Sequence, residues 1–307
     1  MKRYIIIIFT VFVAAVALMC DKKKESGQQE TILAGTTTIL VDESLTPIIE
    51  DQVAVFESDY NAKVKLLPRS EVEAIQALAK DSARIIILAR NLNAAERKMF
   101  DKRKIIPKVT MFATDAIALI ANREHQDTLI ALDDVIRFIR GDRAGSRIRG
   151  LVFDDPNSST VRQMNELAGV ATTPSEGIYS FRTNEEVIKF VAENRDMVGV
   201  VGLNWLSQPS AEVSRYREKI NILSLKAKGG THYFYPSQNN LAEGKYPLAR
   251  DLYIVNAQGY SGLGVGFASF IAGERGQRIV LKSGLLPVRI PGRKIVTRTK
   301  IETNNNN

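Results

Sequence analysis

Strand-like runs alternate with helix-like runs along most of this 307-residue chain, and this alternation limits the fold more than any other feature. Residues 36–41 (TTTILV) have the composition of a strand, and Thr46-Pro47 then opens a run of apolar residues at helical spacing. Residues 84–88 (RIIIL) are almost uninterruptedly apolar, which is typical of a strand covered on both faces. Repeated strand–helix units predict an α/β fold with mainly parallel sheets.

Other segments continue the pattern. Further strands are expected at residues 64–67, 151–153, 197–201 and 252–255, and further helices at 71–79, 132–139 and from 262 onward. Capping boxes, in which a polar residue is followed three positions later by glutamate, mark helix starts at Asn93 and Thr183. A globular part of roughly 290 residues suits two domains, each with its own core.

The N-terminus has the form of an export signal. A basic start (Met1-Lys2-Arg3) precedes an apolar run over residues 4–19, and polar residues 21–30 follow Cys20, the only cysteine. This order resembles a bacterial lipoprotein signal, although Leu18-Met19 stand where small residues are usual. It predicts a signal peptide over residues 1–19, lipidation of Cys20, a flexible tether over 20–35, and a lipid-anchored place in the cell envelope on its periplasmic or extracellular face. An ordinary secretory signal and an uncleaved anchor are the alternatives.

Composition narrows the functional class. The net charge of +8 favours a small anion, an acidic lipid surface or nucleic acid, although a solvated basic surface explains it equally simply. Nucleic acid is the weakest of these, because the chain has an export signal and its basic residues are spread out. His125 and His232 lie far apart, so no histidine-rich metal site is expected. No Walker A loop, HExxH or nucleophile elbow occurs, and no cofactor or enzymatic activity is predicted.

Three predicted strands end in loops that carry hydroxyls or arginine before a helix. These loops are residues 42–46, residues 89–91, and residues 157–160 followed by Arg162. In open α/β sheets, ligands bind beyond the carboxyl ends of the strands, where helix N-termini offer free N–H groups to anions. Each loop alone is adequately explained as a helix cap, but the three together indicate an oxyanion site.

The segments that carry these loops resemble a family, the phosphate-binding lipoproteins of ABC importers, which have the type 2 periplasmic-binding-protein fold. The resemblance covers residues 36–288 and rests on the order of short motifs, among them residues 84–92, 153–160, 197–202, 246–253 and 276–288. It implies two lobes with a ligand cleft between them and two crossings, near residues 115–118 and 223–227. Lobe I is then expected over 36–115 and 224–300, lobe II over 116–223, and a disordered tail over 301–307.

The resemblance also implies the site residues. The first loop contributes Ser44, the backbone N–H of Leu45 and Thr46, and the loop before the later helix contributes Ser158, Ser159 and Thr160. Two positions depart from the family. Ala89-Arg90 stand where serine and aspartate are usual, and Asp154 stands where an arginine is usual. Arg90 is therefore predicted to supply the missing guanidinium, with Arg162 beside it. Asp42, with Asp154 or Asp155 as alternatives, is the candidate proton acceptor.

The resulting functional prediction is an extracytoplasmic solute-binding protein. It captures an inorganic oxyanion, phosphate first among the candidates, and delivers it to the membrane permease of an ABC importer. The alternative is an envelope-anchored sensor or adhesion protein that keeps the fold without phosphate specificity. An enzyme on the same fold is the third hypothesis. His232 lies in a glycine- and tyrosine-containing segment and is read as a loop residue rather than a lining residue of the cleft.

Overall fold

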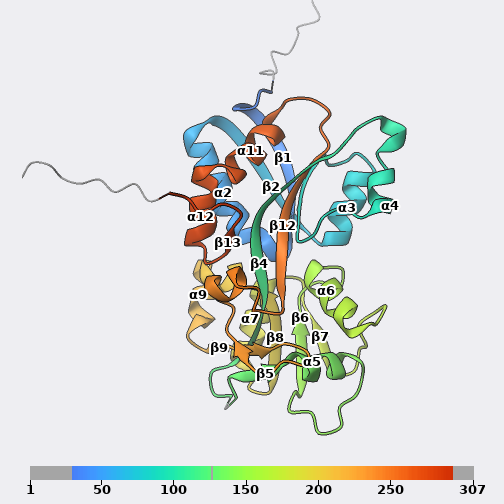
Figure 1. Cartoon of the computed structure of the whole chain (residues 1–307), viewed down its shortest axis with the longest axis vertical. Coiled ribbons are helices and arrows are strands. Elements are labelled where there is room, and N and C mark those ends of the chain that lie inside the picture. The colour runs from blue at the N-terminus through green and yellow to red at the C-terminus, as the bar shows by residue number, and fades with distance from the viewer. Residues whose placement is uncertain (1–29, 126, 293–307) are drawn as a thin grey trace, which may run out of the picture.

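The structure, a computed structural model, describes residues 30–125 and 127–292. It contains two lobes joined by two neighbouring strands, which lie side by side through the middle of the molecule in Figure 1. A 10-stranded sheet extends through both lobes. Its order is β2 (Asn61–Arg69), β1 (Ala34–Asp42), β3 (Ile85–Leu88), β12 (Ala249–Asn256), β4 (Lys108–Asn122), β8 (Met197–Gly202), β6 (Gly150–Phe153) and β7 (Ile178–Ser180), with β13 (Leu286–Pro287) and β9 (Ile220–Ile222) also paired to β4. The predicted α/β fold with two lobes is confirmed. No helix within the described residues is long and apolar enough to cross a membrane.

Lobe I is built on a mixed sheet, in which β1, β2 and β3 are parallel and β12 is antiparallel to β3, and helices cover both of its faces. Its elements are β1 (Ala34–Asp42), η1 (Glu43–Leu45), α2 (Thr46–Asp59), β2 (Asn61–Arg69), α3 (Glu71–Ala79), β3 (Ile85–Leu88), α4 (Ala94–Lys98), η2 (Asp101–Arg103), α11 (Leu263–Ala272), α12 (Glu274–Lys282) and β13 (Leu286–Pro287). Helices α2, α11 and α12 lie on one side of the sheet and α3 and α4 on the other (Figure 1). Strand β3 is therefore buried at all of its positions, as its apolar run predicts.

Lobe II repeats this arrangement around a second apolar core. Its elements are β5 (Leu129–Ala131), α5 (Leu132–Ile139), β6 (Gly150–Phe153), α6 (Ser159–Ala168), β7 (Ile178–Ser180), α7 (Asn184–Glu193), β8 (Met197–Gly202), α8 (Asn204–Ser207), α9 (Ala211–Arg217), β9 (Ile220–Ile222), β10 (Ser224–Lys226), β11 (Tyr233–Phe234) and α10 (Gln238–Ala242). The capping boxes predicted at Asn93 and Thr183 are both formed, at the starts of α4 and α7.

Two strands carry the chain between the lobes. Strand β4 (Lys108–Asn122) contributes Ala113 to the core of lobe I and Ala116 to the core of lobe II, so the chain passes between the lobes within this strand. The return is strand β12 (Ala249–Asn256), which pairs antiparallel with β4.

The second crossing therefore differs from the prediction, which placed it near residues 223–227. Leu225, Leu241 and Leu248 all belong to the apolar core of lobe II. Strand β10 pairs with β5 and β11 in a small sheet of that lobe and does not cross over. Residues 224–248 consequently lie with lobe II. The sequence could not show this, because an apolar strand-like run does not itself reveal which sheet it joins.

Candidate functional site

Buried polar side chains from both lobes meet where the lobes touch. Burial of polar groups away from water is costly unless they find hydrogen-bond partners, so such a concentration is unusual in a protein interior. We call this set the interlobe polar cluster, and it consists of Asp42, Glu43, Ser44, Asp115, Asp154, Ser158, Ser159, Thr160, Asn184, Asn204 and Arg250, all of them buried.

The loop after β1 brings Ser44 to the boundary. Asp42 ends the strand and turns the chain, because its Oδ1 accepts hydrogen bonds from the Ser44 backbone N–H (3.1 Å) and from Ser44 Oγ (2.8 Å). Ser44 Oγ lies 3.2 Å from Ser159 Oγ in lobe II. The other oxygen of Asp42, Oδ2, is buried and has no hydrogen-bond partner. The loop thus offers a hydroxyl and a free carboxylate oxygen at one place.

The N-terminus of α6 supplies the hydroxyls of lobe II. Ser158 is the N-cap, with Oγ accepting from the Val161 backbone N–H (3.2 Å) and donating to Asp154 Oδ1 (2.6 Å). Ser159 and Thr160 occupy the first helical turn. Their backbone N–H groups lie at the positive end of a ten-residue helix, which is a favourable location for an anion.

Arg250 at the start of β12 joins these hydroxyls to a carboxylate. Its Nε and Nη2 donate to Asp115 Oδ2 (3.1 and 2.8 Å), while Nη1 donates to Ser159 Oγ (3.1 Å) and Thr160 Oγ1 (3.5 Å). Burial raises the pKa of Asp115, and the contact with Arg250 opposes that rise. Arg250 is the only buried basic side chain among the described residues. One edge of its guanidinium is therefore fixed and the other faces the hydroxyls.

In a second part of the cluster, one side-chain amide donates hydrogen bonds to two carboxyl groups. Asn184 Nδ2 donates to Glu43 Oε2 (2.6 Å) in lobe I and to Asp154 Oδ2 (3.1 Å) in lobe II. Burial, followed by the repulsion of Asp154, raises the pKa of Glu43 to about 8. Burial and the nearby Asp42 raise the pKa of Asp154 to about 7, although hydrogen bonds and Arg250 oppose the rise.

Close backbone approach at Gly202 completes the contact between the lobes. A Cβ at this position would lie 2.6 Å from the Ser44 carbonyl oxygen and 3.0 Å from Arg250 Nη2. The same carbonyl accepts a hydrogen bond from Asn204 Nδ2 (2.7 Å). The glycine therefore allows the end of β8 to approach the first loop of lobe I.

Arg90 and Arg162, both predicted to bind the anion, make other contacts. Arg90 Nε (2.8 Å) and Arg162 Nε (2.7 Å) both donate to Oε1 of Glu71, whose side chain is only 2% exposed. Arg90 also pairs with Glu96, and Arg162 with Glu166. The two arginines do converge, one from each lobe, but an internal carboxylate lies between them. No direct hydrogen bond is found between them and the interlobe polar cluster.

The remaining predicted residues lie nearby or elsewhere. Leu45 is fully buried, and Thr46 is buried with an Oγ1 that has no hydrogen-bond partner. Asp155 accepts a hydrogen bond from the Asn157 backbone N–H within its own loop. His232 is exposed in lobe II. Cys20 lies outside the described residues.

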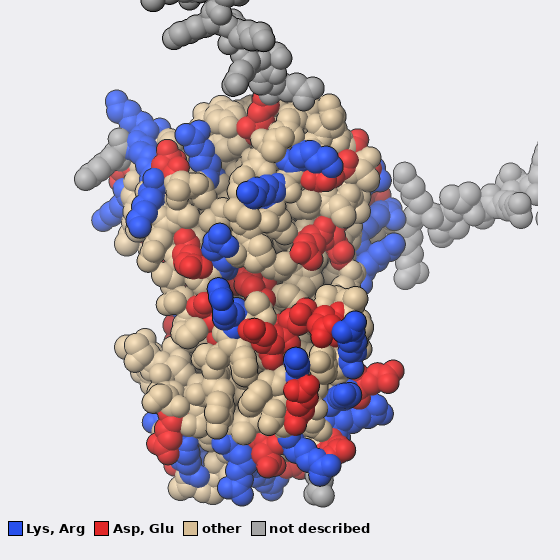
Figure 2. All heavy atoms as spheres, turned by 180° about the vertical axis from the view of Figure 1, so that it is seen from behind, with Lys and Arg blue, Asp and Glu red and all other residues tan. Residues whose placement is uncertain are grey.

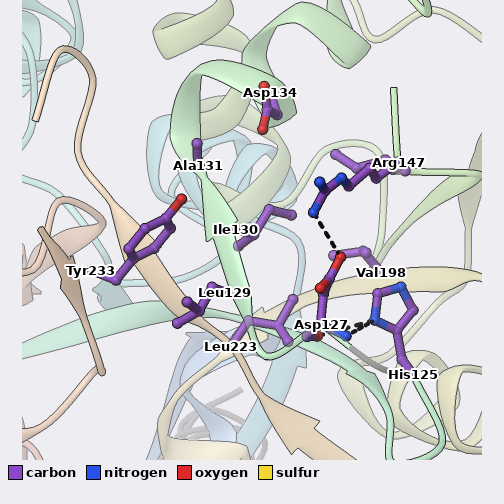
Figure 3. A pocket seen from close by; sticks show the side chains of 11 residues that line it. His125, Asp127, Leu129, Ile130, Ala131, Asp134, Arg147, Val198, Leu223 and Tyr233 are labelled. Carbon is purple, nitrogen blue, oxygen red and sulfur yellow. Dashed lines mark hydrogen bonds and ion pairs between the residues drawn. The ribbon is translucent and has the colours of Figure 1, made fainter. Parts of the chain in front are cut away.

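Two open cavities lie outside the interlobe polar cluster. Figure 3 shows one of about 310 Å³ in lobe II, where His125 and Leu129 line the wall and Asp127 pairs with Arg147 (3.1 Å). A groove of about 510 Å³ lies where the lobes meet, and Thr46, Glu50, Glu185 and Trp205 are among its lining residues. The groove borders a predicted site residue, whereas the lobe II cavity contains none.

The surface around the junction differs in charge from the rest of the molecule. Figure 2 shows acidic side chains gathered around the narrow region between the lobes, while lysines and arginines spread over both ends. On this face, the positive net charge of the chain is therefore not concentrated between the lobes.

Arg250, Asn184 and Asn204 were not predicted as site residues. Arg250 lies in residues 246–253, one of the segments on which the family resemblance rests. The sequence therefore marked this segment as part of the family pattern, although not Arg250 as a binding residue. For Asn184, the sequence predicts only a place at the start of a helix. Asn204 follows the glycine that ends β8, and nothing in the local sequence separates it from an ordinary helix residue.

Comparisons with known proteins identify the family and the fold. The family model described as the PBP superfamily domain matches residues 26–275. No curated protein sequence matches the chain.

Solved structures of similar fold include proteins assigned to phosphate transport. One, from Clostridium perfringens with bound phosphate, is assigned as a phosphate ABC transporter substrate-binding protein. It has 18% identity and a TM-score of 0.67, covering 83% of this chain and 100% of its own. A phosphate transport receptor from Vibrio cholerae has 16% identity and a TM-score of 0.62, covering 82% and 100%. PstS from Borrelia burgdorferi has 22% identity and a TM-score of 0.51, covering 83% and 99%. At these identities the likeness shows the fold.

Proposed function

The chain belongs to the PBP superfamily domain family, and we propose that it is an extracytoplasmic solute-binding protein that captures an inorganic oxyanion between its two lobes. Phosphate is the first candidate, and the membrane permease of an ABC importer is the proposed recipient. The observation that carries the proposal is the guanidinium of Arg250, which is buried at the lobe boundary and directed at the hydroxyls of Ser159 and Thr160. The neighbours' assignments to phosphate transport support the choice of anion.

The chemistry of the cluster fits a tetrahedral oxyanion. Ser159 and Thr160 present hydroxyl groups that can donate to anionic oxygen, and Arg250 adds a permanently charged planar donor. The Ser44 hydroxyl, which donates to Asp42 in the closed form, lies beside them. The backbone N–H groups of Ser159 and Thr160 lie beside these hydroxyls, at the positive end of α6, and add donors for a ligand. Charge-assisted hydrogen bonds in a water-excluded site are the strongest that a protein can offer to such an ion.

Asp42 supports a protonated oxyanion over a fully ionised one. Its Oδ2 is buried without a partner and can accept a hydrogen bond from a P–OH group. Sulfate has no proton to donate near neutral pH and would meet only repulsion from this carboxylate. The expected order of affinity is therefore phosphate above sulfate.

Entry of the anion requires the lobes to separate. The 3.2 Å contact between Ser44 and Ser159 leaves no room for an ion between the two loops. Strands β4 and β12 are the connections about which the lobes can open, and renewed closure around the anion would be the signal read by the permease. We further propose that Cys20 carries the lipid that holds the protein at the membrane.

The test is titration calorimetry of the purified protein with phosphate and then sulfate, after removal of bound anion by unfolding and refolding. We expect phosphate affinity at micromolar level or tighter. Arg250→Lys keeps the charge but loses the planar fork, and Ser159→Ala removes a hydroxyl, so each should weaken binding at least tenfold, since a hydrogen bond to a charged group contributes about 1.5–3 kcal/mol.

Two further variants separate the alternatives. Arg278→Ala removes an exposed arginine of α12 and should leave affinity unchanged. Loss of binding in Arg90→Ala, with Arg250→Lys unaffected, would instead restore the site predicted from sequence. A folded protein that binds neither anion would favour an envelope sensor or adhesion role.

A further inference from the structure

Carboxyl groups outnumber basic groups in the interlobe polar cluster. Asp42, Glu43, Asp115 and Asp154 are all buried there, and Arg250 is the only buried basic side chain of the described residues. Arg250 already forms an ion pair with Asp115. Three carboxyl groups therefore remain without a cation at a place proposed to receive an anion. Burial of several unpaired negative charges is prohibitively unfavourable, so the cluster needs another source of positive charge.

The geometry identifies where that charge can be held. Glu43 extends from lobe I, and Asp154 follows β6 in lobe II, so the two carboxyl groups come together only when the lobes meet. Asn184 holds both, with Nδ2 donating to each of them. The orientation of this amide is fixed, because its Oδ1 accepts a hydrogen bond from the Gly202 backbone N–H (3.0 Å). The Asn184 backbone N–H also donates to Glu43 Oε1 (3.1 Å).

The groups facing this pair are mostly negative. Asp42 at the end of β1 repels both carboxylates, while Arg250 on β12 attracts Asp154 from the other side. Asp115 on β4 is already engaged with Arg250. Ser158 and Asn184 contribute neutral donors only. Solvent cannot neutralise the pair either, since Asp154 is fully buried and Glu43 only 9% exposed.

We propose that Glu43 and Asp154 form a proton-binding site shared between the lobes, so that lobe closure, and the anion capture that depends on it, takes up a proton from solvent. The proton adds to a carboxylate oxygen of the pair, with no other bond formed or broken. The inference rests on the proposed function, because closure is taken as the step that holds the anion. It adds that the protein binds an oxyanion together with a proton.

The direction of the pH dependence follows from the two states. With the lobes apart, the carboxyls return to water and to ordinary pKa values, 4.5 for Glu43 and 3.8 for Asp154. With the lobes together, burial raises both pKa values, to about 8 and about 7. Closure therefore has its full advantage only below the open-state pKa values of 3.8 and 4.5. The advantage falls as the pH rises and is lost above the closed-state pKa values of about 7 and about 8. Each proton taken up on closure lowers the affinity up to tenfold per pH unit as the pH rises between the open-state and closed-state pKa values. Above about pH 8 the dependence ends, because neither state then holds the proton.

The experiment is phosphate calorimetry at pH 6, 7.5 and 9 in buffers of different ionisation enthalpy, which gives the number of protons taken up. Phosphate itself titrates in this range, so the result is the difference between the protein and its variants. We expect Glu43→Gln and Asp154→Asn to take up fewer protons and to lose less affinity at pH 9. Glu166→Gln, which alters an exposed carboxylate, should match the unaltered protein. Equal proton uptake in all four proteins would overturn the proposal.

A second readout does not need the anion. Small-angle scattering should show the ligand-free protein becoming more compact as the pH falls from 9 to 6, and Glu43→Gln should remain compact at pH 9. A radius of gyration that is the same for both proteins at every pH would also overturn the inference. Absence of phosphate binding together with this compaction would refute the proposed function alone and leave the proton site standing.

Discussion

The Oγ atoms of Ser44 and Ser159 lie 3.2 Å apart although 115 residues separate them in the chain. Ser44 follows β1 of lobe I, and Ser159 opens α6 of lobe II. Two loops that cap their own elements thus also meet each other, with Arg250 contacting Ser159 from β12. The hydroxyl pair marks the point at which both lobes and one crossing strand converge.

Asp42 should determine which oxyanion is accepted. Asp42→Asn keeps the shape of the side chain and replaces the unpaired carboxylate oxygen by a neutral group. We expect the ratio of phosphate to sulfate affinity to fall at least tenfold, because the repulsion of sulfate is removed and the acceptor for P–OH is weakened. Parallel calorimetric titrations measure this ratio. An unchanged ratio would show that Asp42 does not face the anion.

Gly202 should be intolerant of any side chain. In Gly202→Ala the added Cβ would lie 2.6 Å from a backbone oxygen of lobe I, which cannot move aside as a flexible side chain can. We expect the lobes to be held apart, with a larger radius of gyration in scattering and at least tenfold weaker phosphate binding. Gly292→Ala is the matched control, since nothing lies within 4 Å of a Cβ there.

Glu71 should act as a latch between the lobes. In Glu71→Gln, Arg90 and Arg162 lose the buried carboxylate that joins them, and its loss should destabilise the closed form by about 1–3 kcal/mol. Stopped-flow measurement of phosphate release should then give a faster rate. Glu166→Gln breaks a largely exposed pair, with Glu166 64% exposed, and should change the rate little. Equal rates in the two variants would argue against the latch.

The two adjacent serines of α6 should separate stability from binding. Ser158→Ala removes the N-cap of α6 and should lower the free energy of unfolding by about 1 kcal/mol, measured by urea denaturation. Ser159→Ala removes no cap and should leave stability nearly unchanged while weakening phosphate binding. If Ser159→Ala destabilised the fold as much as Ser158→Ala, its proposed role would be structural.

Much of the fold could be predicted because local patterns determine it. The buried run of β3 and the capping boxes of α4 and α7 depend only on nearby residues, and all three are present. The second crossing could not be located in this way. Whether β10 pairs with β5 or crosses to lobe I is decided by contacts distant in sequence.

The site shows the same limit. The hydroxyl loops could be found because caps have a local signature, and the structure brings Ser44, Ser159 and Thr160 near Arg250. The partner of each arginine could not be predicted. Arg90 follows β3 as an anion-binding residue would, yet Glu71 and Glu96 lie within reach and take its hydrogen bonds. Such competition depends on side chains from separate elements.

Strands β4 and β12 are neighbours in one antiparallel ladder, from Ala249 opposite Ala116 to Asn256 opposite Lys108. The two connections must therefore bend as one ribbon, because separate movement would break their shared hydrogen bonds. A ribbon flexes easily across its flat face and resists bending in its plane, so the lobes have essentially one soft direction of relative motion. A single angle would then describe the position of the molecule between open and shut, and the proposed permease would need to recognise only that angle.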